Sequence, residues 1–182
     1  DCGPGNALMD HWCQQHRGEP FDRDGAWAAS GQAVPVLLQH LLGEPYLHQD
    51  PPKSTGRDLF NPQWLEQHLR QCPPAPAPDV QATLLELTAS ACAESAMRYK
   101  NNSKLLAVCG GGAFNGRLMA RLQALLPGLH VLPTDALGLP AQQVEAAAFA
   151  WLARQCLLGL PGNLPSATGA QGARVLGAIY PA

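Results

Sequence analysis

Apolar residues recur at the spacing of a helix face over much of the chain. From 7 to 15, Leu8, Met9 and Trp12 fall on one side of a predicted helix, and Asn6 stands where a cap would bind its first turn. Similar patterns, opened by a proline or a capping residue, predict further helices over residues 34–42, 61–70, 79–100 and 141–158. The chain is therefore expected to be rich in helices.

Two of these helices carry a long face of apolar or small residues. The longest is expected to start at the cap Asp79, and small residues on one face allow close packing on a sheet. This face consists of Leu84, Leu87, Thr88, Ala91, Cys92, Ser95 and Tyr99. The helix over 141–158 carries on one side Val144, Ala148, Trp151, Leu152 and Cys156.

Short apolar runs predict strands in the second half of the chain. Residues 104–126 read as a strand, three consecutive glycines and an amphipathic helix, and residues 130–132 and 175–180 are two further strand candidates. Strands and helices in alternation indicate an α/β layered domain, in which ligands gather at the carboxyl ends of the strands.

The triple glycine at 110–112 is the most distinctive stretch. Backbone without Cβ atoms lets a ligand approach the main chain and meet the positive end of the following helix, which is the outline of a nucleotide cradle. A tight turn that binds nothing has the same sequence. The glycines alone leave both interpretations open.

Asp1 precedes a second glycine turn, Gly3-Pro4-Gly5, which leads into the helix over 7–15. A carboxylate placed just before such a turn faces whatever the turn binds. The alternative is an aspartate that only forms the turn.

A loop with basic and hydroxyl side chains offers a further candidate. Lys53, Ser54, Thr55 and Arg57 surround a glycine and are suited to a phosphate or an anionic sugar substituent. The loop is no Walker A motif, because the G-x-x-x-x-G-K frame is missing. A solvated basic loop is the alternative.

Composition narrows the function classes. The apolar fraction of 46% over 182 residues fits a folded globular protein, and a net charge of −2 with interspersed signs gives no stripe that predicts nucleic-acid binding. Neither a signal peptide nor a run of 18 apolar residues is present, so membrane insertion is not expected. The first residue is not Met, and DCGPGN resembles the middle of a motif, so we expect an N-terminal part that this sequence lacks.

Six cysteines are scattered without a C-x-x-C motif: Cys2, Cys13, Cys72, Cys92, Cys109 and Cys156. Their apolar neighbours favour buried free thiols in a reducing cytoplasm over disulfides or zinc sites. The proline-rich stretch over 72–78 is expected to be a stiff, extended connector.

A Rossmann dinucleotide-binding unit is one interpretation of the glycines. Asp135 follows the second predicted strand, near where a ribose-binding acid belongs. Asn115 stands in place of the third glycine of G-x-G-x-x-G, counted from Gly110, which weakens the match.

A phosphotransferase interpretation uses more of the chain. Such an enzyme needs a carboxylate that takes a proton from the attacking hydroxyl or water, backbone donors for phosphates and a bound Mg²⁺. Asp1 supplies the first, and the turns at 3–5 and 110–112 supply the second.

Six motifs resemble the C-terminal half of the bacterial anhydro-N-acetylmuramic acid kinase family. They stand in the family's order and cover almost the whole chain: DCGPGNALMD at 1–10, PFDRDGAWA at 20–28, PPKSTGRDLFN at 51–61, VCGGGAFNGRLM at 108–119, VEAAAFAWLA at 144–153 and PGNLPSATGA at 161–170. One departure is visible, because Cys2 stands where the family usually has Thr.

The resemblance implies an actin-like ATPase (ribonuclease H-like) fold of two lobes around a cleft. Residues 1–182 would form the second, C-terminal lobe, with a mixed sheet flanked by helices, and the N-terminal lobe would lie outside this sequence. Family enzymes use ATP and Mg²⁺ to phosphorylate O6 of 1,6-anhydro-N-acetylmuramic acid while water opens the anhydro bridge at C1. The product, N-acetylmuramic acid 6-phosphate, serves peptidoglycan recycling in the cytoplasm.

The resemblance also implies roles for matching residues. Asp1 would be the general base that activates the water, and Glu145 would lie on the sugar side of the cleft. The nucleotide would contact Gly3, Gly5, Gly110, Gly111, Gly112 and Asn115, with the triple glycine on the adenosine side. The metal ligands stay unassigned, and a homodimer is suggested.

Two alternatives remain open at this point. A non-catalytic nucleotide-binding module of the same fold would bind ATP without phosphorylating a sugar. A Rossmann oxidoreductase would bind NAD(H) at Gly110–Gly112 and depend on Asp135. The isolated 182 residues are expected to have little or no activity.

Overall fold

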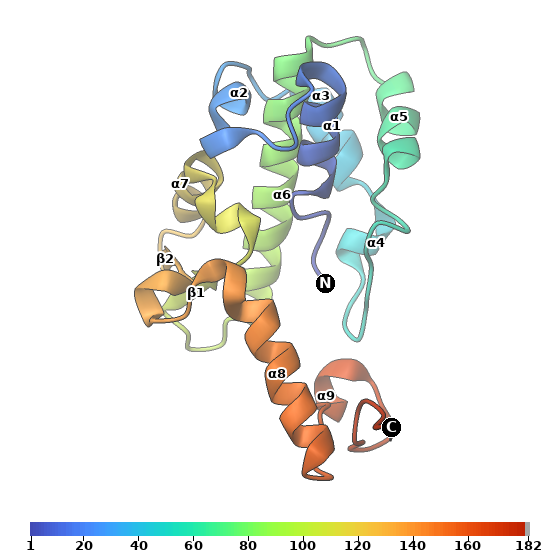
Figure 1. Cartoon of the computed structure of the whole chain (residues 1–182). Coiled ribbons are helices and arrows are strands. Elements are labelled where there is room, and N and C mark those ends of the chain that lie inside the picture. Colours follow the sequence, from blue (N-terminus) through green and yellow to red (C-terminus); the bar gives the residue numbers. More distant parts are fainter. Residues whose placement is uncertain (181–182) are drawn as a thin grey trace.

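A computed structural model describes residues 1–180 and shows helices arranged around one long central helix (Figure 1). The central helix is α6 (Ala77–Tyr99), and α1 (Ala7–Arg17), α2 (Ala26–Ala29), α3 (Pro35–Leu42) and α7 (Gly116–Leu125) pack against it. The remaining helices are α4 (Pro45–His48), α5 (Pro62–Arg70), α8 (Val144–Leu157) and α9 (Pro165–Thr168). Short 3-10 turns span Arg23–Gly25, Gly111–Phe114, Thr134–Leu137 and Ala141–Gln143.

Two short strands form the sheet within residues 1–180. Strand β1 (Leu105–Val108) pairs in parallel with β2 (His130–Pro133), and α7 connects them. The α/β class and the strand, glycine turn and helix order are confirmed. The expected mixed sheet is not seen in the part of the chain that the structure describes, because its two strands are parallel.

Helix α6 is buried on nearly every side along its first two thirds. Its core residues include Leu84 and Leu87, and Gln81 and Thr83 are also fully buried. Polar side chains in a core are costly unless they are hydrogen-bonded. Thr83 accepts a hydrogen bond from the Val34 amide (2.9 Å) and donates one to the Asp79 carbonyl (2.7 Å). These two bonds offset the cost of burying its hydroxyl group.

Helix starts were predicted well where the signal is local. Asn61 caps α5 through a hydrogen bond from the Trp64 amide (2.8 Å), and Pro35 opens α3 as expected. Asp79 was predicted wrongly as a cap, because α6 already begins at Ala77, and its carboxylate instead accepts from the Gln32 amide (2.9 Å). The connector is therefore extended only as far as Pro76.

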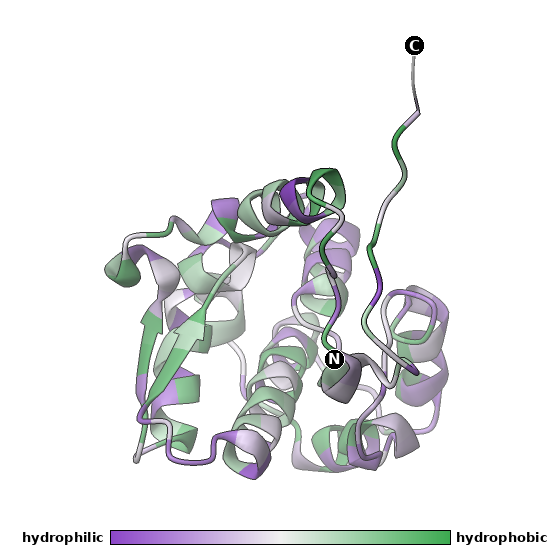
Figure 2. Ribbon diagram, turned by 90° about the horizontal axis from the view of Figure 1, so that it is seen from below, coloured by the Kyte–Doolittle hydropathy of each residue, from purple (hydrophilic) through white to green (hydrophobic). Residues whose placement is uncertain are grey.

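Three other expectations differ from the structure. Asn6 occupies the N-cap position of α1 without a side-chain capping bond. The predicted strand over 175–180 is wrong, because this segment has no strand pairing and instead runs away from the helical body (Figure 2). All six cysteines are free, as expected, but only Cys13 is fully buried.

Helix α8 projects from the body, with α9 at its far end (Figure 1). None of its residues is buried, and Phe149 and Trp151 are 65% and 50% exposed. On the apolar side predicted for this helix, Ala148 and Trp151 are exposed, whereas Val144, Leu152 and Cys156 are half-buried. None of the helices in this range is long and apolar enough to cross a membrane.

Two histidines in the body lie in contact with each other. The rings of His40 and His68 meet edge to face with centroids 4.8 Å apart, and His40 Nε2 and His68 Nδ1 are buried without a hydrogen-bond partner in the described chain. Burial, and secondarily the neighbouring His40, lower the pKa of His68.

We predict that acid destabilises the protein partly through His68. Above the unfolded pKa of about 6.5, the ring is neutral in both states and contributes no pH dependence. Below it, the unfolded chain takes up the proton first, so stability falls until the pH passes below the lower folded pKa. His68→Phe should therefore lose less stability than the wild type between pH 7.5 and 5.5, as measured by urea unfolding.

The exposed His130 offers a matched control. His130→Gln should keep the pH dependence of the wild type. Equal slopes in His68→Phe and the wild type would contradict the assignment.

Candidate functional site

Asp1 is exposed, but its carboxylate has a defined position. Asp1 Oδ2 accepts hydrogen bonds from Ser54 Oγ (3.0 Å) and from the Thr55 amide (3.0 Å). Its backbone carbonyl accepts from the Tyr46 hydroxyl (3.0 Å). No hydrogen bond within residues 1–180 ends on Oδ1, so this oxygen is the one that a ligand can use.

The basic loop holds the Asp1 carboxylate through Ser54 and Thr55. Lys53 Nζ donates to the carbonyls of Tyr46 (2.9 Å) and Leu47 (3.1 Å) and lies 4.6 Å from the centre of the Tyr46 ring. Burial raises the pKa of Asp10, and the charge of Arg57 opposes this shift. The loop therefore has a structural task that neither sequence interpretation contained.

The first glycine turn packs tightly on α6. A Cβ added at Gly3 would lie 3.2 Å from Ala91 Cβ, so glycine allows the close approach of the two backbones. Gly5 adopts a positive φ of 56°, and its carbonyl accepts from the Thr88 hydroxyl (2.7 Å). The turn that follows Asp1 is thereby fixed to the central helix.

The second glycine turn follows β1 at its carboxyl end. Gly110 has a φ of 74°, which favours glycine, and its amide donates to the Ala141 carbonyl (2.8 Å). Cβ atoms added at Gly111 and Gly112 would lie 3.5 Å and 3.3 Å from the side-chain amide of Asn6. Asn6 thus faces the glycine turn, which explains why it does not cap α1.

The amino end of α7 is already occupied by side chains. Asp24 Oδ1 accepts from the Gly116 amide (2.8 Å), and Asn115 Oδ1 accepts from the Leu118 amide (3.0 Å). Asn115 is only 8% exposed. The Gly116 and Leu118 amides are therefore bonded within the chain, and Asn115 has a capping role.

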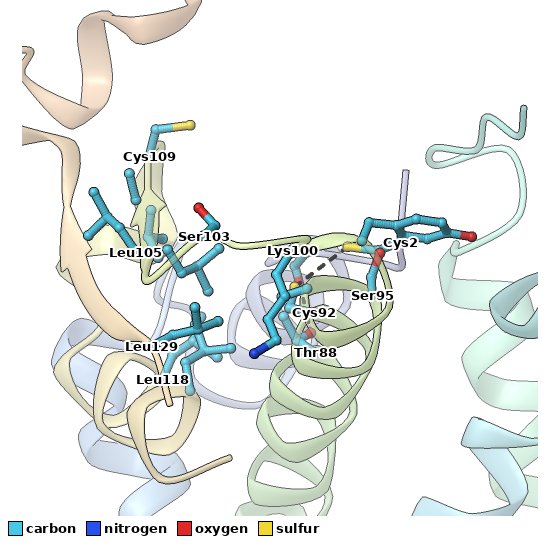
Figure 3. Close-up of a pocket in the computed structure, with 18 of the residues that line it drawn as sticks. Cys2, Thr88, Cys92, Ser95, Lys100, Ser103, Leu105, Cys109, Leu118 and Leu129 are labelled. Carbon is cyan, nitrogen blue, oxygen red and sulfur yellow. Dashed lines mark hydrogen bonds between the residues drawn. The ribbon is translucent and has the colours of Figure 1, made fainter. Parts of the chain in front are cut away.

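A cavity of about 750 Å³ opens between α6 and the β1–α7 unit (Figure 3). Its lining brings together parts of both glycine turns, which lie far apart in the sequence. It includes Cys2, Gly5, Asn6, Thr88, Cys92, Lys100, Leu105, Gly111, Gly112, Leu118 and Leu129. Gly5, Gly111 and Gly112 thus meet at one cavity, as a shared ligand site requires.

The remaining predicted residues do not line this cavity. Asp1 precedes Cys2 at its rim, and Gly3 and Gly110 shape the two turns. Asn115 lines a second cavity of about 560 Å³ on another side of the glycine turn, together with Asn6 and Gly111. Glu145 lies exposed in the first turn of α8, without a hydrogen bond inside residues 1–180.

Asp135 has a structural role that the Rossmann interpretation did not foresee. Its Oδ2 accepts a hydrogen bond from the Ala141 amide (3.0 Å), and the Ala141 carbonyl accepts one from the Gly110 amide (2.8 Å). Asp135 therefore braces the glycine turn from behind.

Three contributors were missed by reasoning from sequence. Ser54 and Thr55 were noted only for binding anions, and Asn6 only as a cap. The hydrogen bonds from Ser54 and Thr55 to Asp1 span 53 and 54 positions of the sequence. No local pattern predicts contacts over such a separation. Among residues 1–180, no three His, Cys, Asp or Glu side chains cluster as metal ligands.

Comparison with known proteins gives a consistent match. The family model described as anhydro-N-acetylmuramic acid kinase matches residues 1–182. Curated relatives with this name, each aligned along the whole of this chain, are found in Variovorax paradoxus (63% identical) and Pseudomonas putida (55% identical). The chain covers 48% and 50% of these two relatives, so it spans about half the length of the curated relatives it matches.

The resemblance seen in the six motifs is thereby confirmed. The chain belongs to the anhydro-N-acetylmuramic acid kinase family.

Proposed function

We propose that the whole protein is an ATP-dependent kinase for 1,6-anhydro-N-acetylmuramic acid. It opens the anhydro bridge with water and phosphorylates O6, giving N-acetylmuramic acid 6-phosphate for peptidoglycan recycling in the cytoplasm. The observation that carries the proposal is the anchored carboxylate of Asp1, beside a cavity lined by both glycine turns, in a chain that matches the kinase family throughout.

Asp1 is the proposed general base. Ser54 and Thr55 both bind Oδ2, which fixes the carboxylate while Oδ1 keeps its lone pairs for the proton of the attacking water. A base must lie within hydrogen-bond reach of the proton that it takes, so holding one oxygen and leaving the other is a suitable arrangement. As this proton leaves, the water oxygen attacks C1 and the released O6 accepts the phosphoryl group.

The glycine turns suit a nucleotide. Gly5, Gly111 and Gly112 carry no side chains toward the cavity, and the Asn6 amide group supplies polar atoms between them. The first amides of α7 are already bonded to Asp24 and Asn115, so they are not free for phosphate oxygens. We therefore place the adenosine part of ATP, and not its phosphates, beside the turn at 110–112. ATP supplies the phosphoryl group and Mg²⁺ balances phosphate charge; the protein ligands of the metal stay unassigned.

We propose further that this chain is the C-terminal lobe of an actin-like fold. The parallel β1–α7–β2 unit is compatible with such a lobe, and relatives about twice as long leave room for a second one. The exposed Phe149, Trp151 and Leu157 on α8 are typical of a surface that another part of the protein covers. Phosphoryl transfer depends on groups positioned from both sides of a cleft.

The first prediction concerns the need for both lobes. The full-length protein should convert the anhydro sugar and ATP, whereas the isolated 1–182 chain should show little or no turnover. Product formation is measured by mass spectrometry, with circular dichroism to confirm that the isolated chain is folded. A folded isolated chain that matches the full-length rate would refute the two-lobe requirement, and ATP binding without turnover by the full-length protein would favour a non-catalytic module.

Asp1→Asn in the full-length protein should lower turnover by a factor of at least about 100, the usual scale for loss of a general base. The amide keeps the shape of the side chain but does not accept the proton. ATP affinity, measured by calorimetry, should change little. Near-wild-type turnover with intact ATP binding would rule out Asp1 as the base.

Ser54→Ala is the comparison for Asp1→Asn. It removes one of two hydrogen bonds to the carboxylate, and bonds to charged groups are worth about 1.5–3 kcal/mol, so turnover should fall about tenfold or more. Ser54→Thr should restore most of it, because the hydroxyl is kept.

Glu145→Ala should weaken sugar binding and leave nucleotide affinity nearly unchanged. Glu145 makes no hydrogen bond within the described chain, so its loss should not disturb the fold. The sugar KM and the ATP affinity are compared with those of Gln143→Ala, another exposed residue just before α8. An unchanged sugar KM and kcat would reduce Glu145 to a residue that complements the helix dipole.

A further inference from the structure

Two cysteines from distant parts of the chain meet beside Asp1. Cys2 lies in the turn that follows Asp1, and Cys92 lies on α6 one turn after Thr88. Their sulfur atoms are 3.7 Å apart (Figure 3), and no other pair of thiols in residues 1–180 is in such contact.

The contact is held by the backbone around it. Gly3 packs against Ala91, and Thr88 donates to the Gly5 carbonyl (2.7 Å), so the segment directly after Cys2 is fixed to the part of α6 directly before Cys92. Both cysteines are half-buried and line the 750 Å³ cavity, which gives a small reagent access to the sulfur atoms.

The surroundings favour a reactive thiol at Cys2. The contact with Cys92 lowers the pKa of Cys2 against the opposing effect of burial. The same contact, and secondarily burial, raise the pKa of Cys92. The thiolate is the form that reacts with oxidants.

We propose that Cys2 and Cys92 form a reversible disulfide when the protein meets a hydroperoxide. The Cys2 thiolate attacks the O–O bond and becomes a sulfenic acid, while hydrogen peroxide is reduced to water. The Cys92 thiol then attacks this sulfur, the S–S bond forms and a second water leaves. Two thiols and one peroxide thus give one disulfide and two waters, and two equivalents of a reducing thiol reverse the reaction.

The cross-link alters the position of Asp1. A disulfide requires an S–S distance of about 2.05 Å, so the sulfurs must move together from 3.7 Å. Asp1 is bonded directly to Cys2, and its carboxylate is held by Ser54 and Thr55 on a different loop. Pulling Cys2 toward α6 therefore strains the hydrogen bonds that position the carboxylate. The effect on turnover rests on the proposed function, whereas the cross-link itself does not.

The experiment treats the reduced full-length protein with limited hydrogen peroxide, blocks free thiols and digests it without reduction. Mass spectrometry should find a Cys2–Cys92 cross-linked peptide that dithiothreitol removes. A protease that cleaves after Glu86 places Cys92 and Cys72 in different peptides. Cys2 and Cys13 share the peptide that ends at Arg17, and fragmentation of this peptide in the mass spectrometer shows which of them is cross-linked.

Two variants provide matched controls. Cys2→Thr keeps a side chain of similar size and should form no cross-link, whereas Cys109→Ser removes an exposed cysteine and should cross-link like the wild type. Over-oxidation of Cys2 without a cross-link, or equal cross-linking through Cys92 in Cys2→Thr, would overturn the proposal.

Turnover provides a second, separate measurement. Oxidation should reversibly lower turnover at least fivefold in the wild type and in Cys109→Ser, and leave Cys2→Thr unchanged. A complete cross-link with unchanged turnover would overturn the effect on Asp1. An absence of kinase turnover before oxidation would instead contradict the proposed function, and the cross-link would still be decided by mass spectrometry.

Discussion

The burial of α6 is the constraint on which the site depends. This helix carries polar side chains into the core, and most of their polar atoms are bonded to a nearby loop or helix, although Gln81 Oε1 has no partner within residues 1–180. Thr83 binds the Val34 amide, Thr88 binds the Gly5 carbonyl, and Glu86 forms two hydrogen bonds of 2.7 Å with Arg121 on α7. The bonds that make burial of the helix possible therefore also fix the loops around it.

Both glycine turns acquire their positions from this arrangement. The first lies on α6 through Gly3 and Thr88, and the second ends the strand of a unit whose helix α7 packs on α6. The cavity between them is thus a consequence of core packing, and Asn6 joins the two turns across it. Asp1 is held differently, by Ser54 and Thr55, so the proposed base and the proposed nucleotide wall are supported by separate loops.

Local sequence patterns predicted the features that depend only on neighbouring residues. The start of α5 at Asn61 and Pro62 and the strand before Gly110 needed only neighbouring residues, and both were found. Asp79 failed as a cap because its partner, Gln32, is 47 residues away, and the strand over 175–180 failed because a strand pattern needs a pairing partner. The family resemblance, which draws on the order of motifs across the whole chain, was confirmed over residues 1–182. The roles of Ser54 and Thr55 depend on contacts that no spacing reveals.

The bonded amides at the amino end of α7 bear on which lobe of the proposed kinase binds the phosphates. Asp24 and Asn115 satisfy the amides that would otherwise attract phosphate oxygens. Lys53, a cation of the loop that anchors Asp1, is directed to backbone carbonyls. A transferred phosphoryl group needs donors and positive charge at its oxygens. In the proposed enzyme these must come chiefly from the other lobe, while this chain contributes the base and the nucleotide wall. Such a division explains why neither lobe is expected to catalyse the reaction alone.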